Sequence, residues 1–328
     1  MSISSSQNSN LSRGFVIALV SAVILSTTGI FVRYLTTTYQ MPALVLAFWR
    51  AFFVTVTLLA VFGVSKRHLL RLNFQQLVYL VFYGLVLAIF NSIWTLSVSI
   101  NGAAVATVLV YCSAAFTALL GRLIMNESLG WYKILAIALC LGGCYLVAGA
   151  YDPSVWNSNL AGIITGVVSG LGYAVYSLMG RSASQRGLNP WTTLLYAFIF
   201  AAGFLLIVNL FFGGLIPGVA LKPIDIFWLG NAINGWGILF LLAAGPTVVG
   251  FGMYMISLSK LPSSVANLIV TMEPAFTAVF AYFLLGEILT GIQIAGSFLI
   301  LGGVVFLRLF EGYQSGKVDK SKGSQVSA

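Results

Sequence analysis

The chain has 328 residues, of which 59% are hydrophobic and only 7% are charged, and its mean hydropathy is +1.00. A soluble domain carries roughly 25% charged residues, so this chain has too few polar groups to cover a water-exposed surface. Intrinsic disorder is excluded as well, because disordered chains are poor in hydrophobic residues and rich in charge. The composition is typical of a protein that crosses a membrane several times.

The net charge of +9 does not indicate a nucleic-acid partner, because the basic residues lie singly between apolar runs. That spacing is typical of the loops that fix membrane topology. One histidine (His68) and three cysteines within apolar runs provide too few ligands for a His/Cys metal cluster. We therefore expect no metal site, no cofactor and no nucleic acid.

Ten segments are long and apolar enough to cross a bilayer. A helix rises about 1.5 Å per residue, so it needs about 20 mostly apolar residues to cross the hydrocarbon core. Barrel strands would instead alternate in polarity over about ten residues, and this sequence shows no such alternation. The sequence predicts an all-α integral membrane protein with ten transmembrane helices. They are residues 13–35, 42–63, 74–97, 102–124, 131–150, 160–183, 190–213, 235–258, 262–285 and 290–310.

Lysine and arginine residues give the orientation of these spans. If the N-terminus is cytoplasmic, thirteen basic residues face the cytoplasm, two (Arg33 and Lys222) face outside, and Arg50 lies within a span. Because cytoplasmic loops carry an excess of Lys and Arg, both termini are predicted to be cytoplasmic. The thirteen are Arg13, Lys66, Arg67, Arg71, Arg122, Lys133, Arg181, Arg186, Lys260, Arg308, Lys317, Lys320 and Lys322.

The sequence repeats itself internally. Residues 97–143 match residues 257–303 at 16 of 47 positions without a gap, and a shift of 148 pairs the first span with the sixth through matches such as Arg33 with Arg181. The chain is therefore predicted to hold two homologous five-helix halves. The predicted parts are an N-terminal tail (1–12), the first repeat (13–150), an external linker (151–159), the second repeat (160–310) and a C-terminal tail (311–328).

An odd number of spans in each half gives the two halves opposite orientations in the membrane. Inverted repeats are a recurring plan of secondary transporters, with the substrate site near the repeat interface and a central cavity that opens to either side in turn. The sequence therefore predicts alternating-access transport. A duplicated scaffold or a passive channel for small solutes remains an alternative.

The second half carries the motifs of a known family. It contains Lys260-Leu261-Pro262-Ser263-Ser264, Met272-Glu273-Pro274-Ala275-Phe276, Leu285-Gly286-Glu287 and Gly302-Gly303, and the first half contains Ala47-Phe48-Trp49-Arg50-Ala51. Over about residues 14 to 310 the chain resembles the EamA family of the drug/metabolite transporter superfamily. The resemblance implies a multi-pass protein of the bacterial inner membrane that exports amino acids or other small metabolites. Sugars, nucleotide sugars and drugs remain alternative solutes.

Two ionisable residues lie deep in apolar spans. Arg50 is eight residues past Pro42, about 12 Å along its helix, and Glu273 is eleven residues past Pro262. A charge at such a depth is costly and faces protein or water. In the functional interpretation Arg50 binds a substrate carboxylate, and Glu273 binds an amine or carries a proton or another coupling ion. In the structural interpretation Arg50 pairs with Glu273 or with backbone carbonyls and holds helices together.

Prolines and polar side chains mark further candidate residues. Pro274 removes a helical hydrogen bond, as does Pro246 with its neighbour Gly245, and freed backbone at membrane depth is tolerated only inside protein or beside a water-filled cavity. Both breaks fall in the second half, and both could also be simple kinks that improve packing. Polar and aromatic residues of the inner spans complete the predicted substrate-binding set: Asn91, Trp94, Tyr111, Ser113, Tyr176, Tyr254, Asn267 and Thr271.

No span carries the residues that an intramembrane enzyme requires. The spans contain no histidine, no pair of aspartates and no Cys/His pair, and an aspartyl site needs two carboxylates. We therefore expect no catalytic residues. The small-molecule substrate and the lipid bilayer are the expected partners.

Overall fold

The computed structural model describes residues 2–310, apart from 112, 126–129, 148–150, 154–159, 286–289, 293, 297, 300, 301, 304, 307 and 308. Within these residues every regular element is a helix, which confirms the predicted all-helical class. Most of the predicted linker (151–159), the predicted C-terminal tail (311–328) and parts of the tenth predicted span lie outside the described residues.

The long helices of the first half are α1 (Ser2–Thr38), α2 (Ala43–Ser65), α3 (Phe74–Asn101), α4 (Ala103–Val110), α5 (Ser113–Met125) and α6 (Trp131–Val147). Those of the second half are α8 (Leu160–Gln185), α9 (Pro190–Phe211), α10 (Ile233–Leu242), α11 (Gly252–Lys260), α12 (Ser263–Val270) and α13 (Glu273–Leu285). Two 3₁₀ turns, η1 (Arg67–Leu70) and η2 (Pro223–Phe227), lie between helices, and the π-helical segment η3 (Ala243–Phe251) joins α10 to α11.

Seven helical stretches of the described residues are long and apolar enough to cross a membrane, so the chain is a multi-pass membrane protein. They are Leu11–Thr38, Ala43–Val64, Phe74–Asn101, Leu160–Gln185, Pro190–Phe211, Ile233–Lys260 and Val265–Leu284. Each overlaps a predicted span. The first helix begins earlier than predicted, because α1 continues through the polar residues of the predicted tail back to Ser2.

The fourth predicted span, 102–124, is not one continuous helix. It is divided at Tyr111 into α4 and α5, and the ninth span is divided at Thr271 and Met272 into α12 and α13. The two breaks lie 160 residues apart, at equivalent positions of the repeat. The break in the first half has no proline and was not among the predicted helix breaks. α12 packs on α5 while α13 packs on α4, so the break accompanies the crossing of two divided helices.

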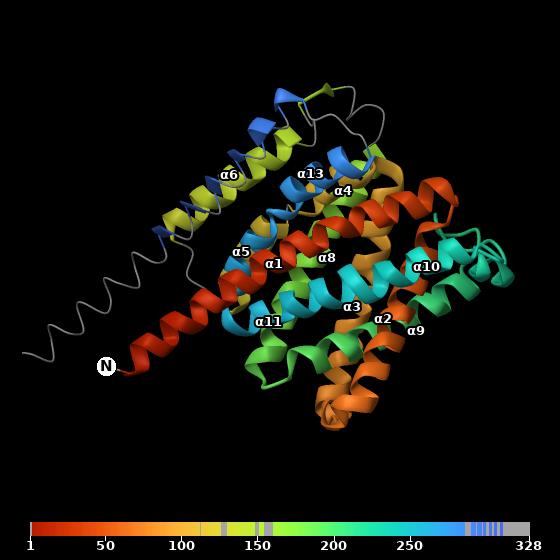
Figure 1. Ribbon diagram of the computed structural model, residues 1–328, viewed down its shortest axis with the longest axis horizontal. Helices are drawn as coiled ribbons and strands as arrows, with labels where there is room; N and C mark the ends of the chain where they lie inside the picture. Colours follow the sequence, from red (N-terminus) through yellow and green to blue (C-terminus); the bar gives the residue numbers. More distant parts are fainter. Residues whose placement is uncertain are drawn as a thin grey trace, which may run out of the picture.

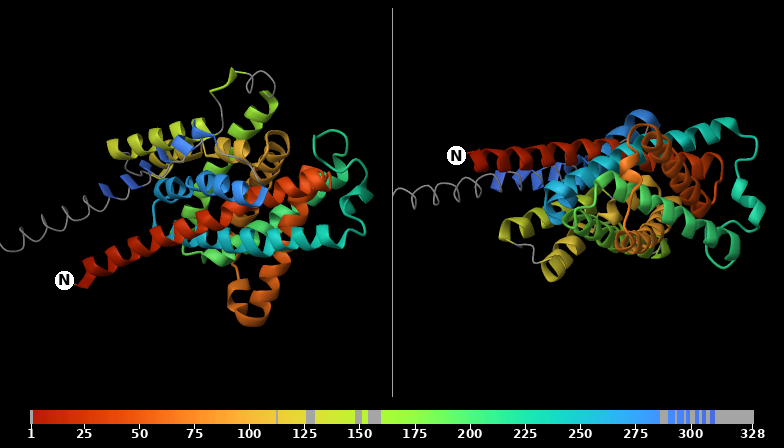
Figure 2. Two further views of the ribbon diagram at one scale, coloured as in Figure 1. Left: turned by 45° about the horizontal axis from the view of Figure 1, so that its top comes forward. Right: turned by 90° about the horizontal axis from the view of Figure 1, so that it is seen from below.

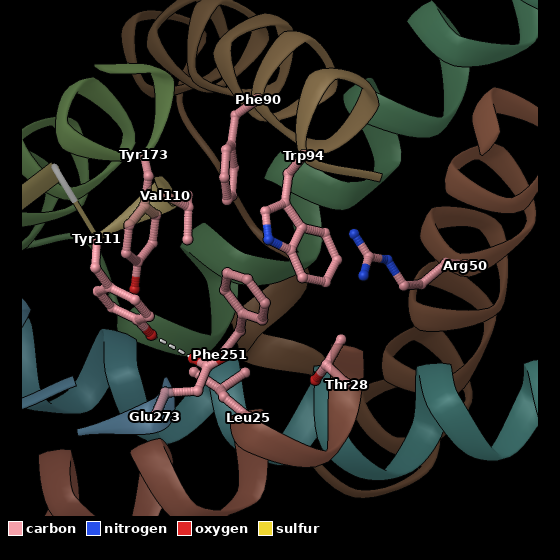
Figure 3. Close-up of a pocket in the computed structure, with 10 residues that line it drawn as sticks. All are labelled: Leu25, Thr28, Arg50, Phe90, Trp94, Val110, Tyr111, Tyr173, Phe251 and Glu273. Atoms are coloured by element: carbon pink, nitrogen blue, oxygen red, sulfur yellow. Dashed lines mark hydrogen bonds between the residues drawn. The ribbon is translucent and has the colours of Figure 1, made fainter. Parts of the chain in front are cut away.

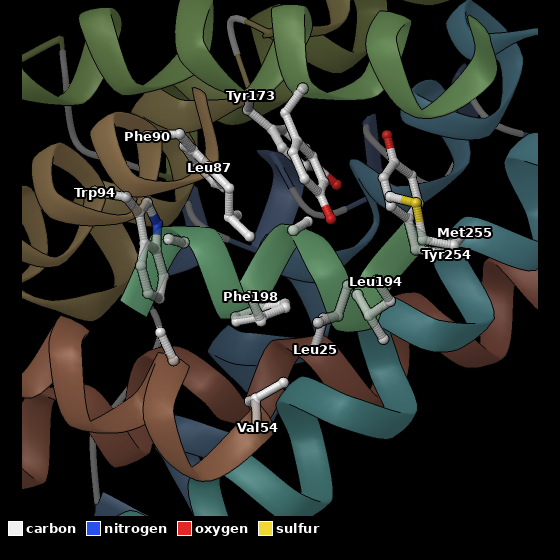
Figure 4. Close-up of a cluster of buried hydrophobic side chains, with 14 of the residues drawn as sticks. Leu25, Val54, Leu87, Phe90, Trp94, Tyr173, Leu194, Phe198, Tyr254 and Met255 are labelled. Carbon is white, nitrogen blue, oxygen red and sulfur yellow. The ribbon is translucent and has the colours of Figure 1, made fainter. Parts of the chain in front are cut away.

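Helix α1 runs the length of the bundle, and α6 lies at its edge in each of the three views (Figures 1 and 2). α1 packs against α11, α12, α13 and η3, while α3 packs against α8 and α9. The core between these helices is built of leucines and aromatic rings, and Figure 4 shows Phe90, Trp94, Tyr173 and Phe198 gathered around it. The centre of the bundle therefore brings together both halves of the chain.

Helix α3 approaches α9 very closely at Gly84. A Cβ atom at this position would lie 2.4 Å from the Cβ of Phe200 and 3.0 Å from the carbonyl oxygen of Ala197. We expect Gly84→Ala to destabilise the protein by about 1–3 kcal/mol through overpacking, seen as a lower melting temperature in detergent. The control is Gly203→Ala on the exposed face of α9, where nothing lies within 4 Å. An unchanged melting temperature for Gly84→Ala would contradict this close packing.

Candidate functional site

A cavity of about 40 Å³ lies where α1, α2, α3, α4, α8, α13 and η3 meet. Its wall is mostly aromatic and aliphatic, with one cationic and one acidic side chain (Figure 3). The volume is enough for a few water molecules and is much smaller than an ordinary ligand pocket. The lining residues are Leu25, Thr28, Arg50, Phe90, Trp94, Val110, Tyr111, Tyr173, Phe251 and Glu273.

Arg50 contributes the positive charge of this cavity. On α2 it shares a face with Ala47 and Val54, which are fully buried, so the helix directs Arg50 into the bundle. The side chain of Arg50 is only 3% exposed. Its Nε and Nη1 atoms are buried, and no hydrogen-bond acceptor lies within reach of them in the described part of the chain. Buried polar groups are nearly always hydrogen-bonded, so this guanidinium is ready to bind an anion.

The ring of Trp94 lies against the guanidinium of Arg50. The Cζ atom of Arg50 lies 5.1 Å from the centre of the Trp94 ring, within the range of a cation–π interaction. In Figure 3 the guanidinium faces one side of the indole from α3. Such an interaction is worth about 2 kcal/mol when desolvated, and a buried charge costs more than that. The Trp94 ring therefore orients Arg50 but does not replace a counter-ion.

Glu273 contributes the negative charge, at the first residue of α13. Its carboxylate accepts a hydrogen bond from the hydroxyl group of Tyr111, drawn as a dashed line in Figure 3. Tyr111 lies at the break between α4 and α5, and Glu273 follows the break between α12 and α13. This hydrogen bond thus joins the two divided helices at the wall of the cavity.

A second polar contact joins the same two helices. The Nδ2 atom of Asn267 in α12 donates to the Oγ1 atom of Thr117 at 2.6 Å and lies 3.5 Å from the Oγ atom of Ser113, both in α5. All three side chains are fully buried. The crossing is therefore held by side-chain hydrogen bonds on either side of the breaks.

Segment η3 delivers the ring of Phe251 to the cavity. Pro246 lies inside this π-helical segment and has no N–H to offer the carbonyl group of Leu242. The hydroxyl group of Thr247 donates to that carbonyl instead, at 2.8 Å. The helix therefore continues to Phe251 with a changed register.

The two halves of the repeat contribute different chemistry at equivalent positions. A shift of 148 places Phe198 opposite Arg50, and a shift of 160 places Ser113 opposite Glu273. Both Phe198 and Ser113 are buried. The first half therefore supplies one basic residue to the cavity and the second half one acidic residue, and the counterpart of each in the other half is uncharged.

Four of the predicted site residues line the cavity: Arg50, Trp94, Tyr111 and Glu273. The others are not among the lining residues. Asn91 is buried with an unpartnered amide group, and the hydroxyl of Thr271 bonds the carbonyl of Leu268 at 2.5 Å. Ser113 and Asn267 take part in the helix crossing, and Tyr176 and Tyr254 are fully buried behind the wall. Gly245 and Pro246 lie in η3, and Pro274 lies in α13.

Sequence reasoning missed the apolar part of the wall, formed by Leu25, Phe90, Val110 and Phe251, and it also missed Thr28. Single apolar residues in apolar spans carry no pattern that marks them. Tyr173 is indicated by the sequence, because it lies one turn before Tyr176 on the same face of α8. Its repeat counterpart is Leu25, which also lines the cavity.

Known transporters are similar to this chain in sequence. The sequence profile of the EamA-like transporter family matches twice, over residues 12–149 and 160–309. The threonine/homoserine exporter RhtA of Salmonella typhimurium is 30% identical over 244 residues, which cover 73% of each chain. An uncharacterized transporter of Archaeoglobus fulgidus is 28% identical over 287 residues, 88% of this chain and 93% of its own.

One solved crystal structure has a similar fold, with a TM-score of 0.70 at 15% identity, and the match covers 91% of this chain and 98% of that one. At such low identity the likeness concerns the fold alone. The two profile matches take in nearly all of the chain, one in each half. The chain belongs to the EamA-like transporter family.

Proposed function

We propose that this protein is a secondary transporter that exports small organic metabolites, such as amino acids or amphipathic compounds, across the bacterial inner membrane. The observation that carries the proposal is the buried guanidinium of Arg50, which faces a central cavity and whose Nε and Nη1 atoms have no acceptor among the described residues. Structural arginines at membrane depth bind carbonyls or carboxylates. An arginine whose Nε and Nη1 atoms have no such partner among the described residues is suited to bind an anionic solute reversibly.

The proposed mechanism is alternating access between two inverted five-helix repeats, residues 13–150 and 160–310, which together form ten transmembrane helices. Two observations support it. The helix breaks at Tyr111 and Thr271 are 160 residues apart, and the divided helices pack reciprocally, α12 on α5 and α13 on α4. Inverted repeats built in this way have two conformations of similar energy, one open to each side.

The proposed orientation has both termini in the cytoplasm. In support, Arg186 lies against Tyr79 near the start of α3. The start of α3 follows Arg67 and Arg71 closely in the sequence. Gly14, next to Arg13, packs against Lys260 and Leu261. These basic residues thus gather around the same ends of α1, α3, α8 and α11, as the positive-inside rule requires of a cytoplasmic face.

Cysteine labelling tests this orientation in a variant whose three native cysteines are replaced by serine. Gln185→Cys, in the exposed end of α8, is expected to react with a membrane-impermeant reagent only in inside-out vesicles. Leu215→Cys, which is exposed between α9 and α10, is expected to react only in right-side-out vesicles. The reverse pattern would contradict the proposed orientation.

The solute we propose has a carboxylate and an apolar body. The carboxylate binds the guanidinium of Arg50, and the aromatic wall, with Phe90 and Phe251, receives the body. The pair of Tyr111 and Glu273 binds an amine or exchanges a proton or another coupling ion. The relatives from Salmonella typhimurium are named as exporters of threonine and homoserine, which supports amino acids. The remaining predicted residues, including Asn91, act from behind the wall, and no enzymatic reaction is proposed.

The cavity must widen to accept such a solute. Its volume of about 40 Å³ is far below the roughly 300–1,000 Å³ of ordinary ligand sites. We therefore assign this conformation to a contracted stage of the cycle. Binding and release then require the helices around the cavity to move, as in a carrier and unlike a permanently open channel.

Counterflow in liposomes tests the proposal. Purified protein is reconstituted with an unlabelled amino acid inside, and entry of the labelled amino acid is measured from outside. A carrier is expected to give saturable uptake that overshoots equilibrium, with a panel of amino acids, sugars and amphipathic drugs defining the solute. Flux that rises linearly with concentration and shows no counterflow would indicate a channel.

A further inference from the structure

Stacked aromatic rings extend from the cavity into one end of the bundle. The rings of Phe90 and Tyr173, which line the cavity, lie 5.1 Å apart and nearly parallel. Phe90 also stacks on Tyr176 at 6.1 Å, and Tyr176 stacks on Tyr83 at 4.7 Å with only 8° between the planes. Tyr83 is followed by Tyr79 at 6.5 Å. We call these five residues of α3 and α8 the aromatic column.

The column leads to the end of the bundle where the basic residues gather. Its last ring, Tyr79, is five residues from the start of α3, and the guanidinium of Arg186 lies 4.7 Å from its centre. The hydroxyl group of Tyr79 donates to the carbonyl of Met179 at 2.6 Å. Tyr83 and Tyr176 are fully buried, so the rings fill the route from the cavity to this face.

Helix α11 closes the same end from a third side. The hydroxyl groups of Tyr254 and Ser177 are 2.5 Å apart, and the hydroxyl of Tyr83 lies 3.5 Å from the sulfur of Met255. At Gly180 a Cβ atom would lie 3.0 Å from the Tyr83 hydroxyl. Helices α3, α8 and α11 are therefore in close contact around the column.

The repeat identifies the positions that would form such a column at the opposite end, and these positions hold smaller side chains. Tyr173 corresponds to Leu25, Tyr176 to Thr28, and Phe90 to Gly250. Gly250 and Leu25 face each other as Phe90 and Tyr173 do, because a Cβ atom at Gly250 would lie 2.6 Å from Leu25. The three equivalent positions of the opposite end thus lie on contacting helices but hold no aromatic ring.

A pair of equivalent arginines shows the same difference between the two ends. Arg181 donates to the carbonyl of Leu258 in the last turn of α11 at 2.7 Å. Its counterpart Arg33 reaches the carbonyl of Ser99 in the last turn of α3 at 3.4 Å, near the limit of a hydrogen bond. The arginine at the end that holds the aromatic column therefore makes the shorter hydrogen bond of the two.

We propose that the aromatic column is the cytoplasmic gate of the cavity and that it is closed in this conformation. The equivalent positions at the outer end hold no aromatic ring, so the helix movement that opens the cavity is expected to connect it to the outside more readily than to the cytoplasm. Opening to the cytoplasm requires Tyr83 and Tyr176 to separate and Arg181 to release α11. This proposal rests on the inverted repeats and the orientation proposed above.

Accessibility of a cavity cysteine tests the gate without any solute. Thr28→Cys is introduced into the variant without native cysteines, and its reaction rate with the impermeant anionic reagent MTSES is measured in oriented vesicles. We expect the rate from the outside to exceed the rate from the cytoplasmic side at least tenfold. Adding Tyr176→Thr, which installs the residue of the opposite end, is expected to raise the cytoplasmic rate at least tenfold.

Tyr196→Thr serves as the matched control, because Tyr196 of α9 is a half-buried tyrosine outside the column whose hydroxyl binds the carbonyl of Leu70. It should leave the cytoplasmic rate unchanged. Tyr83→Leu provides a second opening of the column and should act like Tyr176→Thr. If the Tyr176→Thr and Tyr83→Leu proteins both fail to reach the membrane, the proposal is decided by comparing the labelling rates of the Thr28→Cys protein from the outside and from the cytoplasmic side.

Equal rates from the two sides, or a faster rate from the cytoplasm, would overturn the gate. So would a cytoplasmic rate that stays unchanged in properly inserted Tyr176→Thr and Tyr83→Leu proteins. These readouts are separate from transport. Loss of counterflow with retained labelling asymmetry would refute the transport proposal and leave the gate, whereas counterflow without asymmetry would refute the gate alone.

Discussion

Arg50→Lys is expected to reduce transport about 10- to 100-fold in kcat/KM while the protein is made and inserted normally. Lysine keeps the positive charge but loses the planar fork that binds a carboxylate through two parallel hydrogen bonds. One hydrogen bond to a charged group is worth about 1.5–3 kcal/mol, which corresponds to that loss. Initial rates of counterflow at several solute concentrations measure the effect.

The matched control is Arg67→Lys, the same chemical change in the exposed turn that follows α2. Arg67 donates to the carbonyl of Gly63 and lies far along the chain from the cavity-lining part of α2. The Arg67→Lys protein should transport like wild type. Equal transport by Arg50→Lys, or full transport by Arg50→Ala, would reduce Arg50 to a structural role.

Thermal stability separates the two roles of Arg50 independently of transport. If the guanidinium held helices together, its removal would lower the melting temperature. Because no acceptor lies within reach of its Nε and Nη1 atoms in the described residues, replacement by the similarly long and uncharged methionine removes a costly buried charge. Arg50→Met is therefore expected to melt at the same or a higher temperature and to transport poorly. A large fall in melting temperature would favour the structural role.

Glu273→Gln is expected to fold, to reach the membrane, and to lose the dependence of transport on pH or the preference for amine-bearing solutes. The fold accepts a neutral polar residue at the equivalent position, Ser113. Glutamine also keeps an oxygen that accepts the hydrogen bond from Tyr111. The change thus removes the charge and the exchangeable proton of Glu273 while the contact between the divided helices remains.

The measurement is the pH–rate profile of counterflow, together with the ranking of an amino acid against the same acid without its amine. For Glu273→Gln we expect a transport rate that does not change with pH, or a preference for the amine-bearing solute that is at least tenfold weaker than in wild type. Tyr111→Phe is the complementary variant, because it removes the hydrogen bond and keeps the carboxyl group. A profile and a ranking identical to wild type in Glu273→Gln would make Glu273 a neutral packing residue.

Much of the architecture could be predicted from residue type alone. Apolar runs gave the helices, and the sparse charges drew attention to Arg50 and Glu273, because a charge within a span is costly and therefore rare. Both residues line the cavity.

The rest of the cavity depends on how helices pack, which a single sequence does not reveal. The break at Tyr111 has no proline and arises where two divided helices cross, so no local signal announced it. Phe251 reaches the wall only because the π-helical segment changes the register of its helix. Tyr254 and Tyr176 were predicted to line the cavity, yet Tyr176 stacks within the aromatic column and Tyr254 packs against Tyr173 of that column.

The most direct test of the central claim compares a carboxylate with its neutral amide. Phenylalanine and phenylalaninamide share an amine and an aromatic body and differ at the group proposed to bind Arg50. Each is used as the unlabelled inner solute in counterflow by wild type and by Arg50→Lys. Phenylalanine is expected to drive counterflow at least tenfold better than phenylalaninamide, and Arg50→Lys is expected to remove most of this difference. Equal counterflow by the two compounds in wild type, or an unchanged difference in Arg50→Lys, would contradict the binding of a carboxylate by Arg50.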